Sequence, residues 1–228
     1  MKYLTNPFKS LNRFELTLWI TSLAVVTASY LIVSTSDILP LCASLIGVTA
    51  LIFVAKGRSI GQLLTIVFSV FYGIISIKNQ YYGEMITYLG MSAPMALVAL
   101  ISWIKNPYKN TAEVKVNSLS RKQLTLMSVS CVAVTIAFYF ILRALGNASL
   151  LFSTLSVTTS FLASYLTALR SPYYALAYSA NDIVLIVLWI VASMENPEYV
   201  PMIACFVMFL ANDLYGFYNW RKMKKRQK

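Results

Sequence analysis

Apolar runs of about 20 residues recur along the whole chain, with short polar segments between them. Each run is long enough to cross the ~30 Å hydrocarbon core of a membrane as a helix. Only 12% of the 228 residues are charged, whereas soluble domains carry about 25%. The sequence therefore predicts an all-α polytopic membrane protein with eight transmembrane helices, at residues 15–35, 38–56, 60–78, 83–104, 123–143, 148–169, 172–193 and 200–220.

The basic residues lie almost entirely on one side of this predicted bundle. With the N-terminus in the cytoplasm, 17 of the 19 Lys and Arg residues are cytoplasmic, and only Lys78 and Arg143 are outside. Cytoplasmic loops of membrane proteins are enriched in Lys and Arg, so this asymmetry places both termini in the cytoplasm. Topology thus explains the net charge of +11, and no nucleic-acid partner is expected.

Two pairs of segments resemble each other. Tyr82 and Trp103 are separated by 21 positions, as are Tyr199 and Trp220, and a Met-Ile pair occupies the same place in both segments. Residues 44–59 also align with residues 156–171 without a gap. These matches predict a duplicated three-helix unit. The one helix between the two units would make them parallel, a plan used by transporters with a binding site between repeats.

The predicted organisation has five parts. They are a cytoplasmic N-terminus with an extra helix (1–36), a first repeat (37–104), a cytoplasmic loop with a linker helix (105–146), a second repeat (147–220) and a basic cytoplasmic tail (221–228). The chain contains no Gly-rich phosphate loop or other nucleotide-binding motif, so an ATP-driven mechanism is not predicted.

Ionisable and amide side chains occur within several predicted helices. Such groups are costly in a bilayer and normally face a partner or a cavity. Asp182 and Asp213 lie near mid-depth, about ten and thirteen residues into their segments. Helical spacing places further polar and aromatic residues on shared faces. The candidate substrate-binding residues are Tyr178, Asn181, Asp182, Trp189, Asn212, Asp213, Tyr215, Gln62, Tyr72, Glu84 and Tyr88.

These residue types indicate the chemistry of a ligand. Amides and acids suit ribose hydroxyls and a carboxamide, while unpaired carboxylates and ring faces favour a flat cationic ring. The chain has no histidine, so no catalytic triad, metal site or cofactor is expected, and the protein is not predicted to be an enzyme. The Ser- and Thr-rich segment 153–167 is interpreted as helix packing, and Trp103, Trp220 and Tyr199 as an interfacial aromatic belt.

The segments "SLIGVTALIFVAKGRSIGQ", "YYGEMITYLGMSAPMALVALISWIKNPY" and "ANDLYGFYNWRKM" resemble the PnuC family of bacterial vitamin transporters, over roughly residues 38–228. The resemblance implies two parallel three-helix bundles joined by a linker helix, as in SWEET transporters, and a homotrimer in the bacterial inner membrane. It implies facilitated diffusion of nicotinamide riboside, trapped by a cytoplasmic riboside kinase. The family's site matches Tyr178, Asn181, Asp182 and Trp189, although many members have Trp in place of Tyr178 and Gln in place of Tyr88.

Other functions remain open at this stage. Thiamine is also a cationic aromatic vitamin, and riboflavin is carried by relatives of the same family. A membrane receptor or scaffold that transports nothing is a further alternative, although it leaves the two mid-depth acids, Asp182 and Asp213, without a reason.

Overall fold

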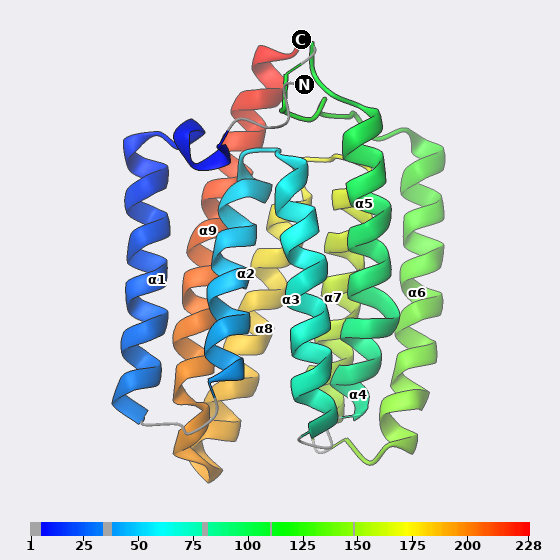
Figure 1. Ribbon diagram of the computed structural model, residues 1–228. Helices are drawn as coiled ribbons and strands as arrows, with labels where there is room; N and C mark the ends of the chain where they lie inside the picture. Colours follow the sequence, from blue (N-terminus) through cyan, green and yellow to red (C-terminus); the bar gives the residue numbers. More distant parts are fainter. Residues whose placement is uncertain (1–5, 34–37, 79–81, 110, 148) are drawn as a thin grey trace.

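A computed structural model describes residues 6–33, 38–78, 82–109, 111–147 and 149–228, and its helices run side by side in one bundle (Figure 1). Short 3-10 turns, η2 (Pro7–Ser10) and η4 (Pro197–Tyr199), precede the first and last long helices. One crossing is composite and runs from α4 (Tyr82–Met85) through the π-helical segment η3 (Ile86–Ser92) into α5 (Ala93–Lys105). The others are α1 (Arg13–Val33), α2 (Leu39–Ala55), α3 (Ser59–Lys78), α6 (Arg121–Ala144), α7 (Leu150–Ala168), α8 (Tyr174–Glu195) and α9 (Val200–Arg226).

The predicted all-α membrane fold is confirmed. Seven helices within the described ranges are long and apolar enough to span a membrane, and α2 is a shorter apolar helix of 17 residues. The helix boundaries lie within about two residues of the predicted ones, apart from the end of α9 at Arg226. The helix continues beyond the predicted apolar run, which ends at residue 220, because the largely basic residues 221–226 extend it as a polar helical end.

The ends of α2 and α7 share one backbone conformation. Gly57 (φ 65°) and Arg170 (φ 58°) follow these helices in the left-handed region. In both cases the next N–H donates back to a carbonyl of the last turn, from Arg58 to Phe53 O and from Ser171 to Leu166 O. This arrangement satisfies carbonyls that a helix end would leave unpaired.

Because the chain reverses direction at each crossing, α2, α5, α7 and α9 end where α1, α3, α6 and α8 begin (Figure 1). We call this the basic end of the bundle, and the opposite one the far end. The basic end is defined by the helix-terminal and loop residues Arg13, Lys56, Arg58, Lys105, Arg121, Lys122, Arg170, Arg221, Lys222, Lys224, Lys225 and Arg226.

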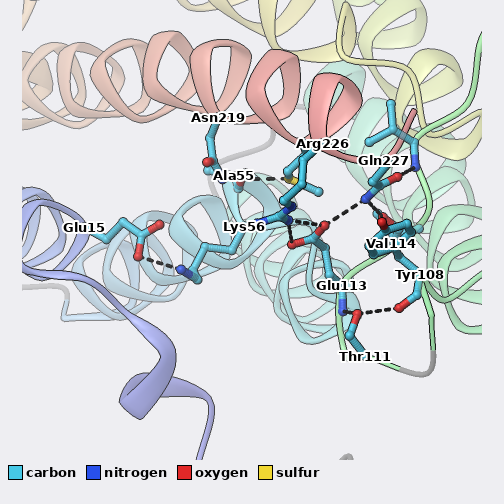
Figure 2. Close-up of polar contacts among 12 residues, drawn as sticks. Glu15, Ala55, Lys56, Tyr108, Thr111, Glu113, Val114, Asn219, Arg226 and Gln227 are labelled. Carbon is cyan, nitrogen blue, oxygen red and sulfur yellow. Dashed lines mark hydrogen bonds and ion pairs between the residues drawn. The ribbon is translucent and has the colours of Figure 1, made fainter.

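Ion pairs and hydrogen bonds tie the helices together at the basic end (Figure 2). Glu15 of α1 is buried and accepts hydrogen bonds from Lys56 Nζ at 2.6 Å and from Tyr215 Oη at 2.6 Å. It thereby joins α1 to both α2 and α9. Glu113, in the loop before α6, accepts from Arg226 and from Gln227 Nε2, which anchors the end of α9 to that loop.

The aromatic-belt interpretation of Trp103 and Trp220 is wrong. Their side chains are only 2% and 0% exposed and lie in the core rather than facing lipid. The two rings contact each other with centroids 5.3 Å apart, and Tyr174 packs edge-on against Trp220 at 5.0 Å. The hydropathy pattern placed both residues near a membrane interface, but it carried no information on the direction in which their side chains point.

A candidate substrate pocket between the helices

Two adjoining pockets lie inside the bundle. The central pocket is enclosed by α2, α3, η3, α7, α8 and α9, and its polar lining is Gln62, Thr65, Ser69, Tyr88, Ser92, Ser160, Ser164, Tyr178, Asn181, Asp182 and Asp213. The far pocket lies toward the far end, where its lining includes Tyr72, Glu84, Asn147, Ser153, Ser156 and Trp189. Tyr88, Ser92, Ser160, Leu185 and Phe206 line both pockets, so these residues form the boundary between them.

A pair of carboxyl groups forms the polar centre of the central pocket. Asp182 of α8 and Asp213 of α9 are 2% and 3% exposed, and both line this pocket. Asp182 Oδ2 is buried without a partner in the described part of the chain, so it is an acceptor available to a ligand. Among the described residues, no Lys or Arg lines either pocket.

Asn181 and Tyr178 are held by hydroxyl groups of α7. Asn181 Oδ1 accepts from Ser156 Oγ at 3.0 Å and from Thr159 Oγ1 at 2.9 Å. Its amide nitrogen is then the group that can donate to a ligand. Tyr178 Oη and Ser164 Oγ are 3.0 Å apart and share a hydrogen bond. These contacts pre-orient two polar side chains at the wall of the central pocket.

Aromatic rings gather where the two pockets meet and in the far pocket. Tyr88 lies with its ring centroid 4.5 Å from that of Tyr72 and 6.0 Å from that of Phe68. Trp189 packs on Tyr199 at 5.3 Å, and its buried Nε1 has no partner among the described residues. Flat rings and an unused N–H donor beside a cavity suit a planar ligand that carries a carbonyl group.

Helix geometry explains why one face of α8 supplies so many of these groups. Tyr178, Asp182, Leu185 and Trp189 recur at intervals of three or four residues and therefore lie along one side of the helix. The π-helical turn of η3 carries Tyr88 and Ser92 to the boundary between the pockets. Single π-helical turns within α-helices are frequent at functional sites.

Nine of the eleven predicted site residues line a pocket. Gln62, Tyr178, Asn181, Asp182 and Asp213 line the central one. Tyr72, Glu84 and Trp189 line the far one, and Tyr88 lines both.

Asn212 and Tyr215 are not part of this site. Asn212 Nδ2 donates to Ser22 Oγ of α1 at 3.0 Å, and Tyr215 Oη donates to Glu15. Both side chains therefore face α1. Adjacent helical residues point about 100° apart, and here that rotation turns Asn212 toward α1 while Asp213 lines the pocket.

Sequence reasoning missed part of the lining. Ser160 and Ser164 of α7 line the central pocket, although the segment that contains them was interpreted as helix packing alone. Ser156, Ser160 and Ser164 recur every four residues, which places them on one face of α7. This four-residue spacing is the sequence signal that indicates a polar face of α7 turned toward a pocket. Thr158 does fit the packing interpretation, since its hydroxyl lies 2.8 Å from that of Thr135 on α6.

The sequence model of a family described as "Nicotinamide mononucleotide transporter" matches residues 37–222. The chain belongs to this family, the PnuC transporters. Similar PnuC proteins named "Nicotinamide riboside transporter PnuC" occur in Neisseria mucosa, with 28% identity over 91% of this chain and 81% of that protein, and in Haemophilus influenzae, with 27% identity over 90% and 89%.

A solved structure of the family has the same fold. The protein described as "Crystal structure of the Vitamin B3 transporter PnuC" matches with a TM-score of 0.81 and 28% identity, over 96% of this chain and 95% of that one. Membership of the PnuC family and the apolar helices together identify a multi-pass membrane protein.

Proposed function

We propose that this protein transports nicotinamide riboside across the membrane and is not an enzyme. The observation that carries the proposal is the central pocket, where buried carboxyl groups, an amide and aromatic rings surround a space that no Lys or Arg of the described residues lines. Nicotinamide riboside combines a cationic ring, a carboxamide and a ribose. Carboxylates and ring faces attract such a cation, and the amide of Asn181 can donate to a ribose or carboxamide oxygen.

The charge of the pockets favours the riboside over its mononucleotide. A phosphate group needs cationic or N–H-rich surroundings, and protein sites usually provide these with Arg or Lys. Here Asp182, Asp213 and Glu84 line the two pockets. Bringing a phosphate close to buried carboxylates is repulsive, and the repulsion is strong where the dielectric constant is low. The names of the Neisseria and Haemophilus relatives agree with this preference.

The transport mechanism that we propose is facilitated diffusion. The sequence contains no nucleotide-binding motif that could couple transport to ATP. Uptake would become one-way because a cytoplasmic riboside kinase phosphorylates the vitamin, and the charged product would fit the carboxylate-lined pocket poorly. We further propose that the protein assembles as a homotrimer.

Purified protein in liposomes should let labelled nicotinamide riboside equilibrate without any ion gradient. Unlabelled riboside should compete, thiamine and riboflavin should compete less, and the mononucleotide least. Empty liposomes serve as the control. Accumulation above the external concentration that collapses with an ionophore would show ion coupling. If thiamine competes more strongly than unlabelled riboside, thiamine rather than nicotinamide riboside is the substrate. A complete lack of uptake would favour a membrane receptor or scaffold that transports nothing.

We propose that the basic end faces the cytoplasm of a bacterial cell and that the membrane is the inner one. Reporter fusions after Lys228 and within residues 105–122 should both give a cytoplasmic signal, because cytoplasmic loops are enriched in Lys and Arg. A fusion at Gly146, in the turn that follows α6, should give the opposite signal and is the matched control. A periplasmic signal from either of the first two positions would contradict the proposed topology.

We also propose that residues 37–104 and 147–220 are parallel three-helix repeats, as in SWEET transporters, with α6 as the linker helix and α1 as an extra helix. Matching contacts support this arrangement. Within each unit neighbouring helices pack together, and between the units α2 packs on α9 while α5 packs on α7. The two interfaces correspond to each other when one unit is superposed on the other.

A further inference from the structure

Two tryptophans join the proposed repeats by reciprocal hydrogen bonds. Trp103 Nε1 of α5 donates to Thr167 O of α7 at 2.9 Å. Trp220 Nε1 of α9 donates to Val54 O of α2, also at 2.9 Å. Trp103 and Trp220 are equivalent in the two repeats, so each repeat sends one indole N–H to the last turn of the first helix of the other.

The residues beside the tryptophans repeat the same pattern. Ser102 Oγ donates to Ala168 O at 2.8 Å, and Asn219 Nδ2 donates to Ala55 O at 2.9 Å (Figure 2). The four acceptors are carbonyls in the last turns of α2 and α7, which lack a full set of helical partners. We call these four side chains and their acceptors the reciprocal latch.

The reciprocal latch lies between the central pocket and the basic end. Trp220 follows Asp213 by seven residues on α9, which is about 10 Å along the helix. Tyr174 connects the two regions, with its ring 5.0 Å from Trp220 and 6.2 Å from Tyr178, which lines the central pocket. The two indoles and the Tyr174 ring are fully or almost fully buried. Val54, whose carbonyl accepts from Trp220, lines the central pocket, so the reciprocal latch adjoins the pocket on its basic side.

We propose that the reciprocal latch is the gate of the transport path at the basic end, and that it opens by separation of the two repeats. The inference rests on the proposed transport function. A buried indole N–H is costly without an acceptor, so the closed arrangement holds only while each tryptophan reaches the opposite repeat. Water admitted during opening can satisfy the same donors and carbonyls, which keeps the open arrangement accessible.

The space around Gly216 allows a direct test with disulfides. A Cβ atom at Gly216 would lie 3.5 Å from Ala55 Cβ and 3.7 Å from Ala175 Cβ, and disulfides require about 3.5–4.5 Å. Gly216→Cys with Ala55→Cys joins the two repeats at the latch. Gly216→Cys with Ala175→Cys joins α9 to α8 within one repeat and is the matched control.

Both pairs should be made in the same background. Tyr174→Phe removes a hydroxyl that would lie 2.9 Å from the new Cβ and that has no hydrogen-bond partner among the described residues. The three native cysteines are replaced by alanine. Mass spectrometry establishes that each disulfide has formed before uptake and riboside binding are measured in liposomes.

The disulfide between positions 55 and 216 should reduce uptake to the level of empty liposomes and leave riboside binding intact, and dithiothreitol should restore uptake. The disulfide between 175 and 216 should leave uptake equal to that of its reduced form. The proposed gate is contradicted if the 55–216 disulfide leaves uptake undiminished, or if the 55–216 and 175–216 disulfides reduce uptake equally. If the cysteine-free parent neither binds nor transports riboside, the proposed function fails instead, and the gate fails with it.

A second measurement does not depend on disulfide formation. Trp103→Phe combined with Trp220→Phe removes both indole donors but keeps an aromatic ring at each position. In this variant a cysteine introduced at Ala50, which lines the central pocket, should react faster with a membrane-impermeant maleimide added at the basic end. An unchanged reaction rate contradicts the role of the indole hydrogen bonds in closing the gate.

Discussion

Asn181→Leu will weaken nicotinamide riboside binding by about 5- to 150-fold, because the buried ligand loses a hydrogen bond worth about 1–3 kcal/mol. The amide oxygen of Asn181 already accepts from Ser156 and Thr159, so its nitrogen is the group left to donate to a ligand in the proposed site. Leucine has a similar size and is favourable in a membrane helix, so insertion and expression should remain normal. A binding titration of the purified variant measures the loss.

Asn212→Leu is the matched control for this experiment. Asn212 is also a buried amide, but its Nδ2 bonds to Ser22 of α1 and to Met208 O, and the residue does not line either pocket. This variant should bind riboside as the parent does and should unfold at a lower temperature, because the contact with α1 is lost. If Asn181→Leu binds riboside as tightly as the parent, Asn181 only joins α8 to α7.

Removing both central carboxyl groups will weaken riboside binding by about 10- to 150-fold, whereas removing one will have a small effect. Asp182 and Asp213 line the same buried pocket, and two neighbouring carboxylates repel each other when both are charged, so we expect the pair to hold one proton and to offer a single negative charge to a cationic ring. In Asp213→Asn the amide N–H can take the place of the protonated carboxyl group as hydrogen-bond donor, so Asp182 can remain a charged carboxylate. Adding Asp182→Asn removes the last charge, and hydrogen bonds to charged groups contribute about 1.5–3 kcal/mol.

Titrations with riboside and mononucleotide test this second prediction. The single variant Asp213→Asn serves as the control of nearly identical shape. In the double variant, riboside binding should fall and the difference in affinity between riboside and mononucleotide should narrow, since the repulsion of phosphate is also removed. Equal riboside affinity in the parent and the double variant would mean that the carboxyl pair contributes to packing alone.

Much of the fold could be predicted because a membrane selects for features that can be read directly along the sequence, namely the length of apolar runs and the positions of charged residues. The number and limits of the crossings follow from the length of apolar runs. The mid-depth acids Asp182 and Asp213 were recognisable because a bilayer tolerates few such groups. The repeat was also suggested by sequence and stays a prediction, but the register suggested for it differs by one residue from the pairing of the hydrogen bonds. A gap-free alignment pairs Val54 with Leu166, whereas the reciprocal hydrogen bonds pair Val54 with Thr167.

The sequence by itself determined that this chain crosses a membrane as a helical bundle, with basic residues at one end and polar groups at mid-depth. Only the tertiary structure decided which side chains meet. It turned Asp213 toward the central pocket and Asn212 toward α1, and it buried Trp103 and Trp220 in the core. The physical reason is rotation about the helix axis. One residue changes a side chain's direction by about 100°, and packing against neighbouring helices sets that angle.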